Sequence, residues 1–478
     1  MGLRDIVLLV TIYGSIPFIY MKPFVGVLVW NWLSLMNPHR ISWTLTNQPF
    51  AQIIALAMLS SLLIAQREPK RIPVTPITVT LGLFWFWMLL TTIFSLYPTL
   101  AWWQWDKVWK IMLTTFVAIM VLNSRERIIA LTVVATLSIG YYGFKGGLFT
   151  ILTGGGYRVW GPAGSFIGGN NEIGLALIMT IPLLVFLHYI VEYRLVKLAL
   201  LAGTILCVFA VFGTQSRGAF LGITAMGIYL AWKSKNKVLY LLLGAVLGLV
   251  VFSFMPDTWH ERMATITEYE EDSSAQGRIK AWEMAFNMAM DRPLGGGYET
   301  FKPGAYLMYL PEVGARGTDA HSIYFETLGE HGFIGLALFL LIGLFSLMAC
   351  GRIIRRTRSI PELDWMNMLA RMIQVSLVGY AVSGLFLGLA YFNFYYALVS
   401  IVVGMTTVLK QHETAAVGEA TAPRPAPTPP LARPTPPGPP LPAPAAARTP
   451  AAAGAPVRRN LPTPKEAWAL GRQWYDRL

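Results

Sequence analysis

The sequence predicts an all-α polytopic membrane protein. Of its 478 residues, 55% are hydrophobic and only 13% are charged, whereas a soluble domain carries about 25% charged residues. So few charges cannot cover a water-facing surface, and lipid must therefore be most of the solvent around this chain. The apolar residues also gather into stretches near the ~20 residues that a helix needs to cross a bilayer.

Twelve apolar stretches are candidate membrane spans. They cover residues 4–36, 49–66, 77–96, 108–123, 128–149, 171–190, 196–213, 218–232, 238–255, 331–350, 367–387 and 392–409. The first is interrupted at Pro17 and at Lys22-Pro23, so it is either two short helices or one broken helix. No signal-peptide cleavage pattern follows it, and we expect it to remain as an anchor.

The loops between the spans alternate in charge. Basic residues occupy every second loop, at 66–71, 124–127, 192–197, 233–237 and 352–358. The positive-inside rule predicts that these loops are cytoplasmic. The remaining loops then face outward, at 37–48, 97–107, 150–170, 214–217, 256–330 and 388–391.

Parity decides the side of the amino terminus. If residues 4–36 cross once, the chain has about 12 spans and both termini are cytoplasmic. If they cross twice, the total is about 13 and the amino terminus lies outside. Arg4 favours the single crossing by the same rule. We therefore predict about 12 transmembrane helices with both termini cytoplasmic.

Four regions follow from this pattern. Residues 1–255 hold membrane helices 1–9, residues 256–330 form a large outward loop domain between spans 9 and 10, and residues 331–410 hold helices 10–12. Residues 411–478 are rich in Ala and Pro, which predicts a disordered cytoplasmic tail. Within the loop, helical spacing of apolar residues predicts a helix over 276–290, and Asp291-Arg292-Pro293 ends it.

Charge and cysteine content exclude several classes of site. The net charge of +13 is explained largely by the cytoplasmic loops, so we expect no nucleic-acid partner. Cys207 and Cys350 lie in or beside apolar stretches without metal-type spacing, which predicts neither a disulfide nor a zinc site. The acidic run at 268–272 is interpreted as a solvated helix surface, and no Asp-x-Asp pair occurs in an outward loop.

Basic and polar side chains concentrate in the outward loops. Arg217 follows a short turn between two spans, where an arginine is costly unless it lines a polar cavity or snorkels to lipid headgroups. Arg278 lies on the predicted loop helix, and His321 precedes the next apolar run, where we expect it to share a helical face with Tyr324. The glycine-rich loop after residue 153 adds Arg158 and Asn171, either as ligand contacts or as parts of a flexible turn.

Arginine and histidine without a carboxylate pair predict an anionic ligand, because guanidinium groups match phosphate oxygens bidentately. Outside the cytoplasm neither ATP nor nucleotide sugars are present. The activated donors available there are lipid-linked and carry a pyrophosphate between a polyprenol and a glycan. Fixed arginines would stabilise the charge that grows on such a leaving group.

Three motifs carry a resemblance to a known family. They are Ser216-Arg217-Gly218, Gly277-Arg278-Ile279-Lys280-Ala281-Trp282, and the run from His321 to Gly335 with its Glu330-His331-Gly332 step. Together they resemble the O-antigen ligase and polymerase superfamily of bacterial membrane glycosyltransferases over roughly residues 150–405. The stretch from Lys22 to Arg40 is similar to a subgroup described as O-glycosylation ligases.

The resemblance implies a family C-type glycosyltransferase fold in the bacterial inner membrane, with the large loop in the periplasm. It implies an O-antigen ligase that transfers a glycan from undecaprenyl pyrophosphate to a hydroxyl of lipid A–core. Arg217 and Arg278 would bind the pyrophosphate, and His321 would be the general base or a further phosphate contact. Trp282 and Tyr324 join Arg158 and Asn171 as predicted substrate-binding residues. No nucleophilic carboxylate is evident, so we expect inversion without a covalent intermediate, and neither a cofactor nor a metal.

Three other functions stay open. An O-antigen polymerase or a protein O-oligosaccharyltransferase would use the same donor with a different acceptor. A transporter of lipid-linked oligosaccharides would need ionisable residues at the membrane midplane, and the span centres here are nearly free of charge.

Overall fold

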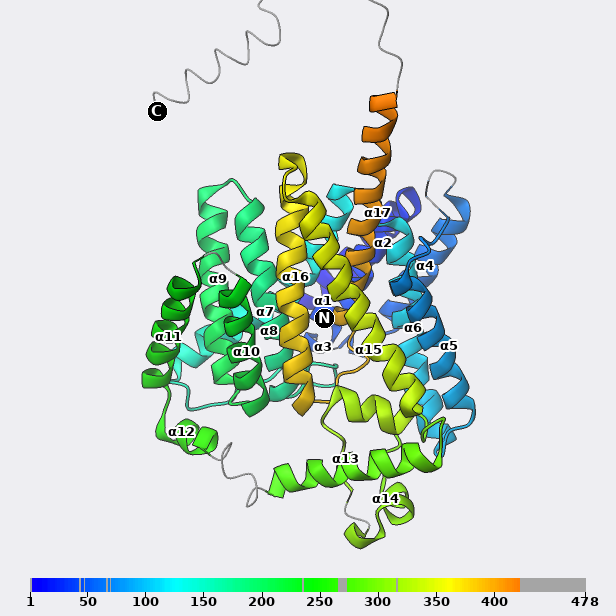
Figure 1. Cartoon of the computed structure of the whole chain (residues 1–478), viewed down its shortest axis with the longest axis vertical. Helices are drawn as coiled ribbons and strands as arrows, with labels where there is room; N and C mark the ends of the chain where they lie inside the picture. Colours follow the sequence, from blue (N-terminus) through cyan, green and yellow to red (C-terminus); the bar gives the residue numbers. More distant parts are fainter. Residues whose placement is uncertain are drawn as a thin grey trace, which may run out of the picture. The chain divides into compact units, whose positions relative to one another are not determined.

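The computed structural model describes residues 2–42, 44–46, 48–65, 68, 70–233, 236–264, 273–314 and 317–421. All secondary-structure elements in these residues are helical (Figure 1), so the protein is an all-α polytopic membrane protein, as predicted. Among the described residues, nine helices are long and apolar enough to cross a membrane: α1, α5, α7, α8, α9, α11, α15, α16 and α17. The total of about 12 spans stays a prediction.

The first seven helices form one part of the bundle. They are α1 Leu3–Met21, α2 Pro23–Met36, α3 Pro38–Ile41, α4 Phe50–Ile64, α5 Pro76–Ile93, α6 Pro98–Val121 and α7 Arg125–Leu152. Four of them fall outside the nine: α2, α3 and α4 are shorter, and α6 carries Asp106, Lys107 and Lys110. Charged residues inside a span are expensive in lipid, so these three side chains set α6 apart from the nine.

The first predicted span is a helical hairpin, which corrects the preferred single crossing. At one end, Ser42 Oγ and Thr44 Oγ1 donate to the Asp5 carboxylate over 2.5 and 2.8 Å. At the other end, the Tyr20 and Ser60 hydroxyls lie 2.9 Å apart. Thus α1 and α4 run parallel, and α2 runs in the opposite direction in contact with both. The amino end of α1 therefore shares a side with residues 42–44, and parity then favours an external amino terminus over the predicted cytoplasmic one.

Four further helices precede the large loop: α8 Asn170–Ile190, α9 Arg194–Gly213, α10 Arg217–Lys233 and α11 Lys237–Phe254. Glycine allows α7 and α9 to pack closely. A Cβ on Gly147 of α7 would lie 2.0 Å from the Leu206 carbonyl oxygen of α9, so only glycine lets these backbones approach so closely. This packing holds the ends of α7 and α9 together, where the loops near residues 155 and 215 meet.

The predicted loop helix is present and slightly longer than expected. It is α13 Ser273–Asp291, which ends at the predicted breaker, and the loop also holds α12 Asp257–Ala264, α14 Pro303–Tyr309 and the 3-10 helix Pro311–Val313. In Figure 1, α13 lies across the ends of the bundle helices rather than along them. The acidic run predicted to be a solvated surface, 268–272, lies outside the described residues.

The last three long helices are α15 Ile323–Thr357, α16 Asp364–Ser383 and α17 Asn393–Thr421, with the 3-10 helices Pro361–Leu363 and Gly384–Phe386. Helix α15 begins inside the predicted loop and bends at Gly332, where φ is 67°. The predicted span began at residue 331, so the bend marks that boundary. Helix α17 continues to Thr421, so residues 411–421 are helical rather than part of the predicted tail; residues 422–478 lie outside the description.

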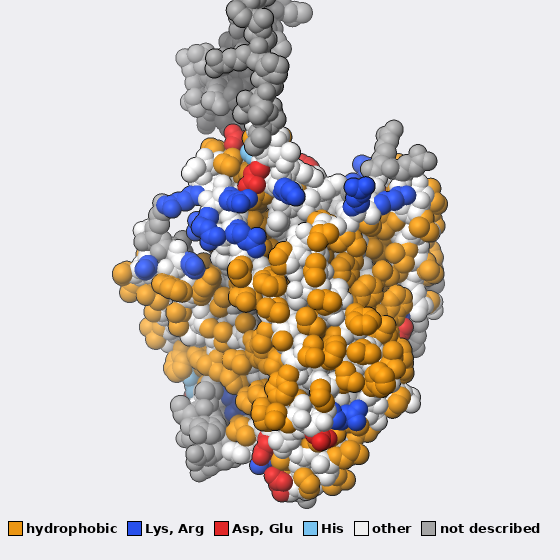
Figure 2. All heavy atoms as spheres, turned by 45° about the vertical axis from the view of Figure 1, so that its right-hand side comes forward, with side chains coloured by type: hydrophobic (Ala, Val, Ile, Leu, Met, Phe, Trp, Pro, Cys, Tyr) orange, Lys and Arg blue, Asp and Glu red, His pale blue; other side chains and the backbone are white. Residues whose placement is uncertain are grey.

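The loops divide between two ends of the bundle as their charges predicted. At the basic end, Arg127 pairs with Glu68 at 2.6 Å, and the Arg125 guanidinium lies 5.6 Å from the centre of the Trp365 ring. At the opposite end, here called the outward end, the Val159 N–H donates to the Gly213 carbonyl over 2.9 Å. Figure 2 shows a hydrophobic band around the helices and Lys and Arg side chains gathered at one end of it.

Candidate active site

One cavity of about 190 Å³ at the outward end collects four of the predicted site residues. Asn171, Arg217, Arg278 and His321 line it, together with Gly218, Arg262 and Phe386. These residues come from the starts of α8 and α10, from α12 and α13, and from the segments before α15 and after α16. Residues far apart in the sequence therefore meet in one basic and partly open space.

The turn before α10 positions Arg217. Helix α9 ends at Gly213, and Gln215 adopts φ 52°, a left-handed conformation that reverses the chain within three residues. The Ser216 hydroxyl then accepts the Ala219 N–H over 3.2 Å, as the N-cap residue of a helix does. Arg217 is thus the first residue of α10, where the positive end of the helix dipole adds to its own charge.

Gln215 ties this turn to two other segments. Its side-chain Nε2 donates to the Gly155 carbonyl over 3.1 Å, and its Oε1 accepts Arg158 Nε over 3.2 Å. Its backbone carbonyl accepts Arg262 Nε over 2.9 Å. A single buried glutamine therefore joins the glycine-rich loop and α12 to the turn that carries Arg217.

Two glycines of α10 allow the residues at the end of α16 and just after it to pack directly against this helix. A Cβ on Gly222 would lie 1.8 Å from Ser383 Oγ, and a Cβ on Gly218 would lie 3.1 Å from the Cβ of Phe386. Any larger side chain at residue 222 would separate α10 from α16. The close approach places Phe386 as an apolar wall beside the basic residues.

Trp282 positions the segment that carries His321. Its indole Nε1 donates to the Ala320 carbonyl over 2.8 Å, and its ring stacks on Phe325 with centroids 4.8 Å apart and planes 5° from parallel. Because Arg278 lies one turn earlier on α13, this contact also holds Arg278 beside His321.

His321 lies just before α15 rather than on its face, which corrects the expectation of a face shared with Tyr324. Its backbone has φ 43°, and the helix begins at Ile323 with Ser322 as the N-cap residue. The Tyr324 hydroxyl instead donates to the Ala381 carbonyl over 2.8 Å and fastens α15 to α16. The left-handed conformation turns His321 out of the helical register and into the cavity.

The surroundings of His321 favour its neutral imidazole. Burial lowers the pKa of His321 below its usual value, and the charge of Arg278 lowers it further. The carboxylates of Asp319 and Glu172 oppose this shift but do not overcome it. At neutral pH the side chain can therefore accept a proton.

The structure brings together four of the seven predicted site residues and separates the other three. Arg158 is exposed and donates to Gln215, Trp282 and Tyr324 donate to the carbonyls of Ala320 and Ala381, and none of the three is among the lining residues. Arg262 was missed because it belongs to no recognisable motif. The one available signal was a basic residue in an outward loop directly after a span.

The Glu330-His331-Gly332 step of the last motif belongs to the core and not to the cavity lining. The Glu330 carboxylate accepts the Glu299 N–H over 2.8 Å and the Tyr391 hydroxyl over 2.6 Å. His331 Nδ1 lies 2.6 Å from Thr91 Oγ1, and its ring is buried. These contacts join α15 to α5 and to the start of α17.

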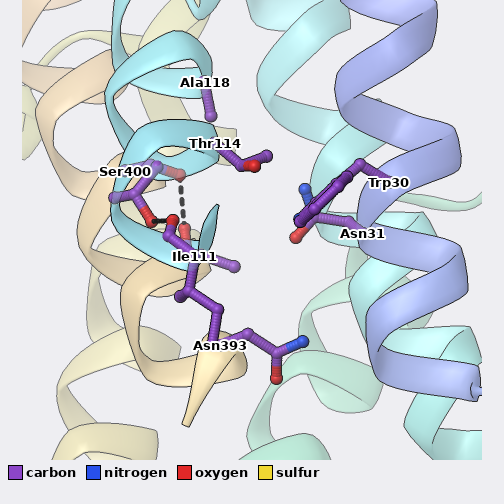
Figure 3. A pocket seen from close by; sticks show the side chains of 9 residues that line it. Trp30, Asn31, Ile111, Thr114, Ala118, Asn393 and Ser400 are labelled. Atoms are coloured by element: carbon purple, nitrogen blue, oxygen red, sulfur yellow. Dashed lines mark hydrogen bonds between the residues drawn. The ribbon is translucent and has the colours of Figure 1, made fainter. Parts of the chain in front are cut away.

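A second, smaller cavity lies inside the bundle between α2, α6 and α17 (Figure 3). Asn31 and Asn393 point their amides into it, and Thr114 and Ser400 also line it. All nine described lining residues are uncharged at neutral pH, so the cavity lacks groups that would attract an anion. Of these two cavities, the one at the outward end is the one lined by charged side chains.

Metal-ligating residues do not cluster in the part of the chain that the structure describes: no group of three or more His, Cys, Asp or Glu side chains could hold an ion there. The predicted metal independence remains to be tested by experiment.

Two family models match the chain. Residues 3–191 match a family of unknown function, and residues 202–340 match the O-antigen ligase family. No curated protein matches the chain. The O-antigen ligase match contains all three cavity arginines and His321, whereas Asn171 precedes it. The match over residues 202–340, less than a third of the chain, supports a resemblance of this region to the O-antigen ligase and polymerase superfamily.

Proposed function

We propose that the protein is an O-antigen ligase of the bacterial inner membrane that works at its periplasmic face. It transfers a glycan from undecaprenyl pyrophosphate to a hydroxyl of lipid A–core. One observation carries this proposal: within an O-antigen ligase domain, Arg217, Arg278 and His321 line one cavity at the end opposite the basic loops.

The donor pyrophosphate binds to the two guanidinium groups in this proposal. Arg217 at the start of α10 and Arg278 on α13 face the cavity from two sides. Each can hold two phosphate oxygens in a planar, charge-assisted pair of hydrogen bonds. Asn171, in the first turn of α8, supplies an amide that can donate to the same ligand. The polyprenyl chain stays in the lipid around the bundle.

The transfer is a single displacement. The acceptor oxygen attacks the anomeric carbon as the bond from that carbon to the phosphate oxygen breaks, and the electron pair leaves with the pyrophosphate. The proton of the acceptor hydroxyl passes to an imidazole nitrogen of His321. Attack opposite the leaving group inverts the anomeric centre. None of the seven described lining residues is a carboxylate that could form a covalent intermediate.

The environment of His321 supports its role as a base over a role as a cationic phosphate ligand. A lowered pKa keeps the imidazole neutral at the pH of the periplasm, and only the neutral form can take a proton. The nearby Arg278 stabilises the pyrophosphate and discourages protonation of His321 before the reaction.

The acceptor separates this proposal from its rivals. A ligase uses lipid A–core, a polymerase uses a second lipid-linked repeat, and a protein O-oligosaccharyltransferase uses a serine or threonine. The family match supports a ligase or a polymerase. We favour the ligase on the resemblance of the three motifs.

A reconstituted reaction tests the proposal. Purified protein in detergent receives a synthetic undecaprenyl pyrophosphate glycan and lipid A–core, with and without EDTA, and the glycosylated product is measured. We expect product in both conditions. Arg217→Ala and Arg278→Ala should each lower the rate by about 100-fold or more, because each removes a charge that stabilises the leaving group.

Lys280→Ala is the matched control, since Lys280 lies on the same helix as Arg278 but pairs with Glu283 at 2.9 Å at the surface. It should keep the wild-type rate. Product with a lipid-linked acceptor alone would identify a polymerase, and loss of activity in EDTA would contradict metal independence. Absence of any glycosidic bond would overturn the enzymatic proposal in favour of a transporter.

A further inference from the structure

Arg262 is a third guanidinium in the cavity, and the function proposed above gives it no role. It lies in the last turn of α12, at the start of the large loop, and lines the same space as Arg217 and Arg278. Its Nε donates to the Gln215 carbonyl over 2.9 Å, so the side chain is held at the turn that also places Arg217.

Packing fixes the helix that carries Arg262. Trp259, one turn earlier on α12, is buried, and its ring lies 6.1 Å from that of Phe212 and 6.0 Å from that of Phe220. These two phenylalanines flank the turn between α9 and α10. The position of Arg262 is therefore set by a buried aromatic cluster and by a hydrogen bond.

The charge of the proposed substrate changes during the reaction. In the intact donor, each phosphate carries one negative charge, because each bears a substituent. When the glycan leaves, the terminal phosphate keeps only its anhydride link to the other phosphate and gains a second ionisation, with a pKa of about 6 as in other singly substituted phosphates. The departing polyprenyl pyrophosphate then carries about three negative charges at neutral pH.

The cavity charge matches the product better than the donor. Three arginines line the cavity, and none of the seven described lining residues is acidic. Two guanidinium groups balance the intact donor, and the third balances the charge that appears only as the bond breaks. An interaction that strengthens toward the transition state raises the rate more than it raises the affinity for the substrate.

We propose that Arg262 is a third anion-binding residue, which stabilises the negative charge that develops on the leaving pyrophosphate. This inference rests on the proposed function. In the transfer, the electron pair of the broken bond stays on the terminal phosphate oxygen, and Arg262 faces that new charge. The acceptor proton leaves through His321, so Arg262 takes no part in proton transfer.

Kinetics and binding test this role together. Arg262→Ala should lower kcat by about 10-fold to 100-fold and change the KM for the donor by less than about 3-fold. Its affinity for farnesyl pyrophosphate, a monoester like the product, should fall by about 10-fold, while its affinity for the intact donor changes little. Arg262→Lys should recover most of both losses, and Arg262→Gln should not, since only lysine restores the charge.

Arg292→Ala is the matched control, because Arg292 belongs to the same loop as Arg262 but donates to the carbonyls of Gly295 and of Phe94 at the end of α5, and it does not line the cavity. It should leave kcat and farnesyl pyrophosphate affinity unchanged. Wild-type rates in Arg262→Gln would mean that Arg262 only tethers the turn, and would overturn the proposal. A raised donor KM with an unchanged kcat in Arg262→Ala would also overturn it.

The two proposals can fail separately. If wild-type protein binds farnesyl pyrophosphate and Arg262→Ala binds it equally well, Arg262 has no anion-binding role, and the proposed function is untouched. If wild-type protein binds neither the donor nor farnesyl pyrophosphate, the proposed function fails and this inference fails with it.

Discussion

Two histidines ten residues apart differ completely in their surroundings. His321 lines the basic cavity from a left-handed residue just before α15. His331, at the bend of the same helix, is buried, with Nδ1 2.6 Å from Thr91 Oγ1 and its backbone carbonyl accepting Trp87 Nε1 over 2.8 Å. Both belong to one sequence motif. Their roles follow from what the fold places around each ring.

The comparison distinguishes a histidine that can contact a ligand, His321, from one that stabilises the helix packing, His331. A ring that lines a cavity can exchange protons with a ligand, whereas a ring enclosed by Tyr298 at 4.7 Å and Phe84 at 6.1 Å has no access to one. The second ring instead joins α15 to α5 through the hydrogen bond to Thr91, and it contacts the rings of Tyr298 and Tyr391. We therefore expect substitutions at the two histidines to affect different measurements.

The largest expected effect is the opposite response of these two histidines to truncation. His321→Ala should lower the transfer rate by about 100-fold or more without changing the thermal unfolding midpoint, because it removes the base and leaves the core intact. His331→Ala should destabilise the protein by about 2–4 kcal/mol, because it leaves a cavity and removes the partner of Thr91. Rates are measured per folded molecule, beside thermal unfolding in detergent. A stable but inactive His331→Ala would refute the division of roles.

Trp282→Ala should have an intermediate effect. It tests whether Trp282 positions His321 or, as the sequence predicted, binds substrate. Loss of the stack on Phe325 and of the bond to Ala320 frees the segment before His321, so kcat should fall by about 10-fold. Trp282→Phe keeps the stack and should lose less. An unchanged kcat with a raised KM for donor or acceptor would instead support direct contact with substrate.

The smallest expected effect is a shift of the pH profile in Asp319→Asn. The Asp319 carboxylate raises the pKa of His321, so its removal should lower that pKa further. The imidazole of His321 then stays neutral to a lower pH. The acidic limb of the pH profile of kcat/KM should therefore shift to lower pH, while the plateau value stays the same. Glu312→Gln, in the same loop, is the matched control and should not move the limb. A shift to higher pH would contradict the assignment of His321 as the base.

Local signals predicted the parts of the site that depend on neighbouring residues. Spacing alone placed a helix over 276–290, and α13 ends at the predicted Asp291. The turn at 214–217 was equally visible, because two apolar stretches flank it. Charge alternation sorted the loops into two groups that do meet at opposite ends. These features need only propensity, hydropathy and charge within about 20 residues.

Long-range contacts decided what these signals could not. A break at Lys22-Pro23 is compatible with a kinked helix or with a reversal of the chain. The hydrogen bond from Ser42 to the Asp5 carboxylate shows that the chain reverses. Trp282 and Tyr324 have the right chemistry for a ligand, yet backbone carbonyls brought near by other helices accept their donors. Arg262 enters the cavity because Trp259 packs between two other helices.

The sequence by itself determined that this chain is a helical membrane protein and which motif residues carry guanidinium and imidazole groups. Those properties follow from solvent preference and from the chemistry of single side chains, which do not depend on the fold. Only the tertiary structure decided which of these groups share one cavity. That outcome depends on helix packing between segments up to about 200 residues apart, such as Asn171 and Phe386.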